Sequence, residues 1–334
     1  MRLQKTLVIG GTLFIGRLLL AELLKAGHEV SVLHRKPNHD LGPEVENLQA
    51  DRNDAESLRT ALAGRRFDAV FDNVYDWERG TASRHVEATV DAIVESCGAG
   101  LSRYIFISSV AAYGGGLGHK EDDPLAPDSH PDAYVRNKAM SERALFRRHQ
   151  ESGLPVVTFR PPYIYGPGNP FYREAFFWDR MHAGRPIVIP GEGDWLMQFV
   201  LVDDLVAAAV ASLTEPGAVG QAFNIGNDSP VTQLALVKLF AKVAGVDPKL
   251  VRIPRKRIIE AGGNPMGKPA YFGVYFDMLP ITEAMGKAER VLKVAMTPFE
   301  KGLEQTHAWY LDHGNRAPMD TSFEDFLLAR QITE

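Results

Sequence analysis

The chain has 334 residues, of which 45% are hydrophobic and 24% are charged, so it is long enough to build a large core and more than one domain. Its formal net charge of −5 excludes the general basic surface that attracts nucleic acid or an anionic membrane. The single cysteine, Cys97, excludes an intrachain disulfide and a cysteine metal cluster.

Neither a membrane nor a metal ion is expected as a partner. No apolar run approaches the ~20 residues that a membrane span needs, and the amino end lacks the pattern of a secretory signal peptide. The ten histidines are scattered, and His34 and His39 have no third ligand at a useful spacing. We therefore expect a cytoplasmic protein without a metal site.

A glycine-rich turn joins the first predicted strand, 3–9, to the first predicted helix, 15–25. The turn reads Gly10-Gly11-Thr12-Leu13-Phe14-Ile15-Gly16. Gly10 permits the tight turn, N–H groups at the start of the helix face a pyrophosphate, and Gly16 lets the helix pack closely on the strand. The pattern predicts a dinucleotide-binding unit, although a glycine turn alone is weak evidence, because any strand-turn-helix unit can carry one.

Predicted strands and helices alternate over the first 160 residues. The strands are expected at 3–9, 29–34, just before Asp51, at 69–72, 104–108 and 156–160, and the helices at 15–25, 55–62, 81–96 and 133–151. This alternation is typical of an α/β fold with a doubly wound parallel sheet.

The pattern breaks after Gly166, where proline, glycine and aromatic residues become frequent. We expect a helix at 172–183, a helix at 204–212 that returns to the main sheet, an ordered loop at 261–280 over the active cleft and a short helix in the tail. The predicted domains are a dinucleotide-binding domain of residues 1–168 with about 199–215, a smaller α/β substrate domain of residues 169–198 and 216–316, and a tail of residues 317–334.

A tyrosine and a lysine, Tyr134 and Lys138, are spaced to share one face of a helix. The ammonium group can lower the pKa of the phenol by favouring phenolate, and such a tyrosine can move protons near neutral pH. An isolated pair of this kind is more often part of an ordinary amphipathic helix. Here the strand at 104–108 runs into Ser108 and Ser109, which are expected at the carboxyl edge of the sheet, where such folds bind ligands.

Three later stretches follow in order: FRPPYIYGPG at 159–168, VLVDDL at 200–205 and AFNIG at 222–226. With them, the chain resembles the extended short-chain dehydrogenase/reductase family, in its NAD(P)-dependent epimerase/dehydratase group, from the first strand to about Tyr310. The glycine turn resembles a GGTxFIG subgroup that includes plastid RNA-binding relatives. The resemblance implies a Rossmann sheet, an NAD(P) cofactor and a small-molecule substrate.

Site residues follow from this resemblance by position. Ser109 matches the family's catalytic serine, with Ser108 as its nearest rival, while Tyr134 matches the acid/base and Lys138 the lysine that holds the nicotinamide ribose. Cofactor contacts are implied for Gly10, Thr12, Phe14, Ile15, Gly16, Arg35, Asp51, Asn73, Ser108, Lys138 and Pro161. Substrate contacts are expected for Tyr75, Ser109, Tyr163, Met197 and Gln198.

The second strand ends without the acidic residue that NAD-specific members place there, and reads His34-Arg35-Lys36. The guanidinium of Arg35 can pair with a 2′-phosphate, which favours NADP slightly over NAD. It can also stack on adenine in an NAD enzyme, or lie solvated in a loop.

The chain departs from the family pattern at three positions. Leu13 stands where the middle glycine is usual, and Tyr163 where nucleotide-sugar enzymes carry asparagine. Met197, before Gln198, replaces an arginine that donates to the diphosphate of the substrate. We therefore expect a substrate that carries no diphosphate.

The leading hypothesis is an NAD(P)-dependent oxidoreductase or epimerase that acts on a secondary alcohol of a sugar or sugar-like compound, and the sequence leaves net reduction and epimerisation open. The alternative is a catalytically silent member that binds RNA or another ligand. A dehydratase is disfavoured, because Val110-Ala111 follow Ser109 where dehydratases place Asp-Glu.

We also expect a homodimer, because family members pair two helices across a two-fold axis as a four-helix bundle. The apolar positions available for this contact are Val86, Val90, Ile93, Val94, Ala139, Leu145 and Phe146. The same side chains can instead face the sheet.

Overall fold

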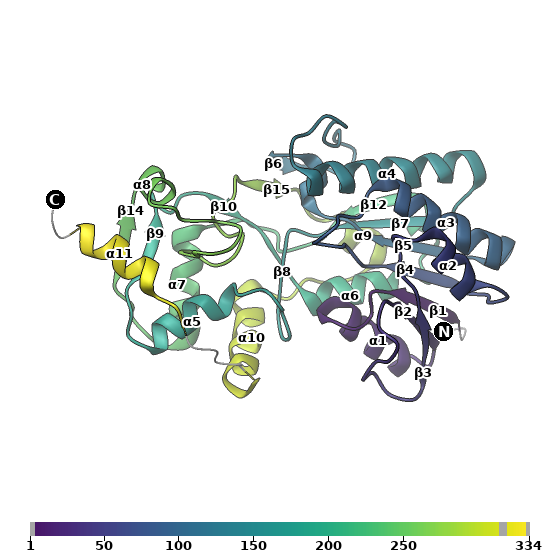
Figure 1. Cartoon of the computed structure of the whole chain (residues 1–334), viewed down its shortest axis with the longest axis horizontal. Coiled ribbons are helices and arrows are strands. Elements are labelled where there is room, and N and C mark those ends of the chain that lie inside the picture. Colours follow the sequence, from purple (N-terminus) through teal and green to yellow (C-terminus); the bar gives the residue numbers. More distant parts are fainter. Residues whose placement is uncertain (1–3, 314–318, 332–334) are drawn as a thin grey trace.

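A computed structural model describes residues 4–313 and 319–331, which form two lobes (Figure 1). The larger lobe is built on a seven-stranded parallel sheet in the order β12-β7-β5-β4-β1-β2-β3. Its strands are β1 (Lys5–Ile9), β2 (Glu29–His34), β3 (Val45–Gln49), β4 (Ala69–Asp72), β5 (Arg103–Ile107), β7 (Val156–Arg160) and β12 (Gln221–Asn224). Its helices are α1 (Phe14–Lys25), α2 (Ala55–Leu62), α3 (Ser83–Cys97), α4 (Ala133–Ser152), α6 (Val202–Ala211) and α9 (Lys287–Leu292).

Helices cover both faces of this sheet. Side chains of a strand alternate between its two faces, so Leu7 and Ile9 pack against α2, α3 and α4, whereas Val8 packs against α1 and α6. Because both faces are covered, the strands are apolar along nearly their whole length. This arrangement confirms the predicted doubly wound α/β fold.

The predicted elements of this lobe agree with the structure to within a few residues. The largest shifts are of two residues, at the starts of β1 (Lys5 instead of residue 3), α6 (Val202 instead of residue 204) and α3 (Ser83 instead of residue 81). The hydroxyl of Thr81 accepts a hydrogen bond from the backbone N–H of Asp76 at 3.0 Å, which ties Thr81 to the preceding loop. Residue 3 of the first predicted strand lies outside the described residues.

The smaller lobe joins paired short strands and helices around a core rich in aromatic side chains. Its helices are α5 (Glu174–His182), α7 (Gln233–Ala244), α8 (Arg255–Glu260), α10 (Phe299–His313) and α11 (Ser322–Gln331). The remaining paired strands are β6 (Gly116–His119) with β15 (Ile281–Glu283), β8 (Tyr163–Tyr165) with β11 (Phe199–Leu201), β9 (Ile187–Pro190) with β14 (Leu250–Ile253), and β10 (Leu196–Met197) with β13 (Val231–Thr232).

The loop at 261–280 and the tail are both packed onto the smaller lobe. Tyr271, Phe272 and Phe276 are buried in its core and so fix the loop. In the tail, Leu327 of α11 joins the same core, and the carboxylate of Glu324 pairs with the guanidinium of Arg180. The predicted tail residues 317, 318 and 332–334 lie outside the described residues.

The predicted assignment of residues 216–316 to the smaller domain is wrong for β12 and for α9, whose Ala288 and Leu292 join the core of the larger lobe. β12 comes from the segment assigned to the smaller domain, yet it pairs in parallel with β7 at the edge of the main sheet. Phe223 of β12 and Phe159 of β7 are fully buried neighbours, so apolar packing holds this strand in the larger lobe.

The helix positions named for a dimer contact mostly face the sheet of their own chain. Val86, Val90, Ile93, Ala139 and Leu145 are buried. Val94, 40% exposed, is the most accessible of the set. Outer positions of these helices carry ion pairs between Arg147 and Glu87 and between Arg148 and Asp91. The homodimer stays a prediction. The buried residues of this set are already packed within the chain, so they are not available for the predicted interface.

Within residues 4–313 and 319–331, no helix is both long and apolar enough to cross a membrane.

Candidate active site

The glycine turn follows β1 and leaves no room for side chains. A Cβ atom on Gly10, which has φ +86°, would lie 2.8 Å from the Cβ of Val74. A Cβ atom on Gly16 would lie 2.1 Å from the carbonyl oxygen of Gly10. Only glycine therefore fits at these two positions, because the turn packs directly against Val74 and the start of the helix packs directly against the turn.

Helix α1 begins at this turn without a capping side chain or an acidic residue in its first turn. The N–H of Gly16 donates to the carbonyl of Leu13 at 2.9 Å, and no side chain competes with an anion for the N–H groups before it. Leu13, at the position where the middle glycine is usual, is 69% exposed and does not fill the turn. Thr12 is half-buried, Ile15 packs against the main core, and Phe14 has a left-handed φ of +37°.

Asn73, at the end of β4, holds the glycine turn in place. Its backbone N–H donates to the carbonyl of Ile9 at 3.1 Å, and its side-chain Nδ2 donates to the carbonyl of Gly10 at 3.3 Å. Its Oδ1 atom is buried without a hydrogen-bond partner among the described residues. An unpartnered acceptor beside an open glycine turn fits a dinucleotide with hydroxyl donors.

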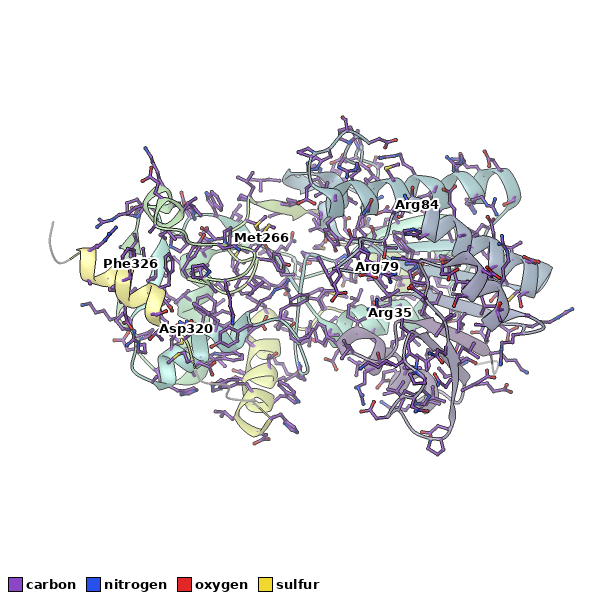
Figure 2. All side chains as sticks on the ribbon, viewed as in Figure 1. Arg35, Arg79, Arg84, Met266, Asp320 and Phe326 are labelled. Atoms are coloured by element: carbon purple, nitrogen blue, oxygen red, sulfur yellow. The ribbon has the colours of Figure 1, made fainter. Side chains whose placement is uncertain are left out.

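Charged side chains gather where β2, β3 and β4 end, and Figure 2 shows Arg35 and Arg79 on this edge of the larger lobe. Arg79 pairs with Asp51 and with Asp76, both at 2.7 Å, and Arg35 lies 3.4 Å from Asp76. The side chain of Arg35 remains 59% exposed. The sequence did not indicate that two carboxylates gather near Arg35.

Tyr134 and Lys138 share one face of α4, as their spacing predicts. The carboxylate of Asp132 caps the helix by accepting from the backbone N–H groups of Tyr134 and Val135 at 2.8 and 3.1 Å. Lys138 is buried, its Nζ donates to the carbonyl of Ile107 at 2.7 Å, and it lies 5.8 Å from the centroid of the Tyr134 ring.

The prediction that the lysine makes the phenol more acidic is wrong for the chain by itself. Burial raises the pKa of Tyr134 to about 12, and hydrogen bonding with the Ser109 side chain opposes that rise. Burial also lowers the pKa of Lys138 to about 8, although the carboxylate of Asp72 favours its charged form. The phenol therefore keeps its proton at neutral pH.

The two serines after β5 have different partners. Ser109 contacts Tyr134 and also accepts from the backbone N–H of Ala111 at 3.1 Å. Ser108 is buried, and its Oγ donates to Glu142 Oε1 at 2.5 Å. The structure thus brings Ser109 to the tyrosine and directs Ser108 into the core of the lobe.

A buried polar network lies behind these serines. Glu142 forms an ion pair with Arg160 at 2.7 Å, and Arg160 donates to the hydroxyl of Tyr113 at 2.7 Å. That hydroxyl donates to Asn224 Oδ1 at 2.7 Å, which links β12 to β7. Next to it, the carbonyl of Pro161 accepts from the backbone N–H of Val110 at 2.9 Å, so Pro161 holds the turn that follows Ser109.

Aromatic side chains surround Tyr134. The Tyr75 ring meets it edge-on with centroids 4.8 Å apart, and the Trp77 ring stacks on it at 4.9 Å. Trp77 is 56% exposed and also stacks on Tyr275 of the smaller lobe at 6.3 Å. The hydroxyl of Tyr163 donates to the carbonyl of Tyr275 at 2.7 Å. Tyr75 therefore lies beside Tyr134, and Tyr163 is connected to it through Tyr275 and Trp77, two residues that the sequence did not indicate.

The side chains of Met197 and Gln198 are not available to contact a substrate. Met197 is buried in the core of the smaller lobe. The side-chain amide of Gln198 donates to the carbonyls of Asn227 and Glu283, and its oxygen accepts from the N–H of Glu283 at 2.9 Å. The expected substrate role of these two residues is wrong, because packing and backbone contacts already use both side chains.

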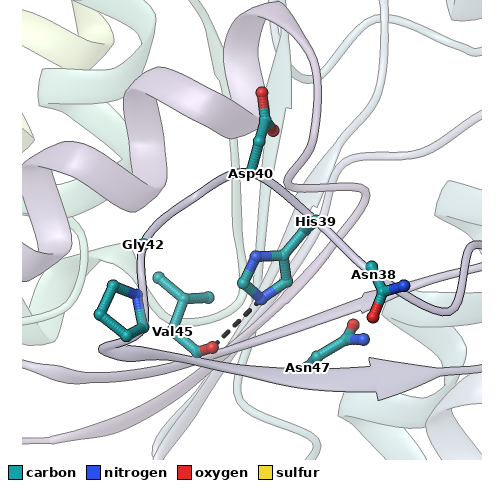
Figure 3. A pocket seen from close by; sticks show the side chains of 7 residues that line it. Asn38, His39, Asp40, Gly42, Val45 and Asn47 are labelled. Carbon is teal, nitrogen blue, oxygen red and sulfur yellow. Dashed lines mark hydrogen bonds between the residues drawn. The ribbon is translucent and has the colours of Figure 1, made fainter.

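A hollow of about 490 Å³ lies in the loop between β2 and β3 (Figure 3). Its lining residues are Asn38, His39, Asp40, Gly42, Pro43, Val45 and Asn47. The ring of His39 hydrogen-bonds to the carbonyl of Val45 at 3.1 Å. The hollow contains neither the glycine turn nor Tyr134, so it is separate from the candidate active site.

Known proteins resemble the chain in sequence and fold. Chloroplast stem-loop binding protein of 41 kDa b from Arabidopsis thaliana is 31% identical over 74% of this chain, and the match spans 65% of that protein. The 3-diazoavenalumate denitrifying reductase of a Streptomyces species is 30% identical over 73% of this chain and 83% of that protein. MoeE5, solved in complex with UDP-glucuronic acid and NAD, has a TM-score of 0.73 and is 24% identical, covering 92% of this chain and 99% of that one, which is a likeness of fold.

The model of the NAD dependent epimerase/dehydratase family matches residues 6–226, from β1 to just beyond β12. This range contains the glycine turn, Ser109, Tyr134 and Lys138. The chain belongs to the NAD dependent epimerase/dehydratase family, which is of the extended short-chain dehydrogenase/reductase type.

Proposed function

We propose that the protein is an NAD(P)-dependent oxidoreductase or epimerase that acts on a secondary alcohol of a sugar or sugar-like substrate. The observation that carries this proposal is the meeting of Ser109, Tyr134 and Lys138 at the carboxyl edge of the sheet that also bears the glycine turn. In this proposal the larger lobe binds the cofactor and the smaller lobe contributes to the substrate site.

The residues that would hold the cofactor are the glycine turn, the first N–H groups of α1, Asn73 and Lys138. When bound, the nicotinamide supplies the acceptor or donor of hydride. Lys138 is positioned by the carbonyl of Ile107 and carries its amino group beside the tyrosine.

Tyr134 moves the proton in this proposal. Its phenol is protonated at neutral pH, so Oη can donate a proton to a carbonyl oxygen of the substrate, and the reverse reaction returns that proton to Tyr134. Ser109 contacts the phenol and can hold the same substrate oxygen by a hydrogen bond. The rings of Tyr75 and Trp77 pack against the Tyr134 ring and fix its position.

The test is a turnover screen of simple sugars, sugar phosphates and nucleotide sugars with both cofactors. A sugar is chosen by analogy with MoeE5, whose structure contains UDP-glucuronic acid. Net consumption of reduced cofactor identifies a reductase, whereas inversion of one carbon without net consumption identifies an epimerase. If neither net consumption of cofactor nor inversion of a carbon is found, and RNA shifts the mobility of the protein, the alternative of a silent binding protein is supported. This alternative is kept because of the likeness to the stem-loop binding protein.

Replacement of each serine by alanine distinguishes their roles. Ser109→Ala is expected to lower kcat with little change in stability, because it removes the hydroxyl beside Tyr134. Ser108→Ala leaves a buried oxygen of Glu142 with one donor fewer and is expected to cost about 1–3 kcal/mol of unfolding free energy, with kcat largely retained. Steady-state kinetics measure kcat and urea denaturation measures the free energy of unfolding of both variants. A large loss of kcat in Ser108→Ala with kcat retained in Ser109→Ala would make Ser108 the catalytic serine.

Arg35 tests the proposed preference for NADP. Arg35→Asp is expected to weaken NADP binding much more than NAD binding, because it replaces a cation by an anion beside the 2′-phosphate. Arg79→Gln is the matched control, since the Arg79 guanidinium is already held by Asp51 and Asp76. Titration of the wild-type protein and both variants with NAD and NADP measures the affinities. Equal losses of affinity for the two cofactors in Arg35→Asp would refute the 2′-phosphate role.

A further inference from the structure

Arg173 is a buried cation enclosed by aromatic rings between β8 and the loop at 261–280. Arg173 directly precedes α5 as its N-cap residue and is 9% exposed. Its guanidinium carbon lies 4.5 Å from the ring centroid of Phe171, 5.3 Å from that of Tyr163 and 5.6 Å from that of Tyr275. These rings form three sides of a box around the positive charge, and cation–π attraction stabilises it there.

Arg173 differs from the other buried arginines of the described residues. Arg52 pairs with Asp72, Arg160 with Glu142, and Arg180 with Glu324. Arg173 has no ion pair in the part of the chain that the structure describes, and its Nε and Nη1 donate to the backbone carbonyls of Val274 and Ile164 at 3.2 and 3.5 Å.

The neighbouring carboxyl group does not take the place of a counter-ion. Glu174 Oε2 accepts from Nδ2 of Asn169 at 2.9 Å, and burial raises the pKa of Glu174 to about 7. Its negative charge is therefore only partly developed at neutral pH. A buried cation without a full counter-charge is costly, so its retention calls for a reason beyond packing.

Ring contacts connect the surroundings of Arg173 to the proposed reaction site. Phe171 meets Trp77 edge-on at 6.0 Å, and Trp77 stacks on Tyr134 at 4.9 Å. Tyr275, which also stacks on Trp77, has a left-handed φ of +68°. Such a backbone conformation is strained for a tyrosine, and here it sets the ring between Arg173 and Trp77.

We propose that Arg173 binds the carboxylate of a ring-containing substrate whose ring lies against Trp77 and Tyr275, with its reacting carbon at Tyr134. The inference rests on the proposed function, because it assigns the substrate class of that same cleft. A planar guanidinium matches a carboxylate by two parallel hydrogen bonds.

A single negative charge is favoured over a phosphate. The charged or titratable groups that act on Arg173 are Glu174, Tyr134, Tyr163 and Tyr275, none of which is cationic. One guanidinium balances one carboxylate, whereas a phosphate monoester would bring a second negative charge close to Glu174. The absence of the diphosphate-binding arginine at Met197 agrees with this choice.

Binding of small probes to the full chain tests the proposal without turnover. The probes are benzoate, glucuronate, the uncharged benzamide and phenyl phosphate, and their binding is followed by calorimetry or by tryptophan fluorescence with Trp77→Phe as the reference. We expect the wild-type protein to bind at least one carboxylate about tenfold or more tightly than benzamide and phenyl phosphate. The preference between benzoate and glucuronate then separates an aromatic acid from a sugar acid.

The variants are Arg173→Met, Arg173→Lys and, as a control, Arg84→Met, which removes an exposed charge of the larger lobe (Figure 2). Carboxylate affinity should fall about tenfold or more in Arg173→Met, fall less in Arg173→Lys and stay unchanged in Arg84→Met. Unchanged carboxylate affinity in Arg173→Met overturns the proposal.

Wild-type protein provides a test that does not depend on folding of the variants, since equal affinity for benzoate, glucuronate and benzamide overturns the proposal, as does tighter binding of phenyl phosphate. Carboxylate binding is measured without cofactor and without turnover. Failure of carboxylate binding is thereby distinguished from failure of the proposed chemistry, which turnover alone reports.

Discussion

Replacement of Tyr134 by phenylalanine is expected to lower kcat by roughly 10²–10⁴-fold, the usual contribution of a general acid–base group. The change removes the hydroxyl that donates the proton and keeps the ring that stacks on Trp77 and meets Tyr75. Cofactor affinity should therefore stay close to the wild-type value. Single-turnover kinetics on a substrate found in the screen, together with a cofactor titration, measure the two quantities separately.

Lys138→Met is the informative companion to this variant. It removes the amino group beside the tyrosine and also the donor to the carbonyl of Ile107, so both kcat and cofactor affinity should fall. Near wild-type turnover of Tyr134→Phe would show that another acid carries the proton, and tyrosine-dependent hydride chemistry would then be the wrong assignment.

The largest expected effect on stability comes from Glu142→Ala. The substitution leaves the Arg160 guanidinium buried without its counter-ion, and breaking a buried pair in this way costs about 3–5 kcal/mol of unfolding free energy. It also removes the acceptor of the Ser108 hydroxyl. Urea denaturation of the variant and the wild-type protein measures the loss.

Glu87→Ala is the matched control for this prediction, because its partner Arg147 lies on the outer side of α3 and α4. Surface ion pairs contribute about 0–1 kcal/mol, so this variant should unfold almost like the wild-type protein. Similar losses for the two variants would mean that the Glu142 network is not a principal support of the lobe.

Local patterns predicted the elements that position the site. The glycine turn marked the passage from β1 to α1, because only glycine has the space that Gly10 and Gly16 occupy. The spacing of Tyr134 and Lys138 placed them on one helix face, because helical geometry depends on sequence separation alone. β12 was misplaced because its pairing with β7 joins segments far apart in the chain.

Properties that depend on burial and distant contacts could not be predicted. The pKa of Tyr134 is raised mainly by burial, which depends on rings from outside its own helix, such as those of Tyr75 and Trp77. The side-chain amide of Gln198 donates to the backbone carbonyls of Asn227 and Glu283, and the sequence contains no sign of either hydrogen bond. Arg173 was missed because the rings around it come from several segments. The local signal that was available is the run Phe171-Tyr172-Arg173.

The central claim is that the cleft between the glycine turn and Tyr134 binds a nicotinamide dinucleotide. Titration of the purified wild-type chain with NADH and with NADPH tests it most directly, with tryptophan quenching and nicotinamide fluorescence as two signals. The structure predicts saturable binding of at least one dinucleotide, with quenching that is reduced in Trp77→Phe because this tryptophan stacks on Tyr134. Absence of saturable binding of either dinucleotide to folded protein would contradict the account.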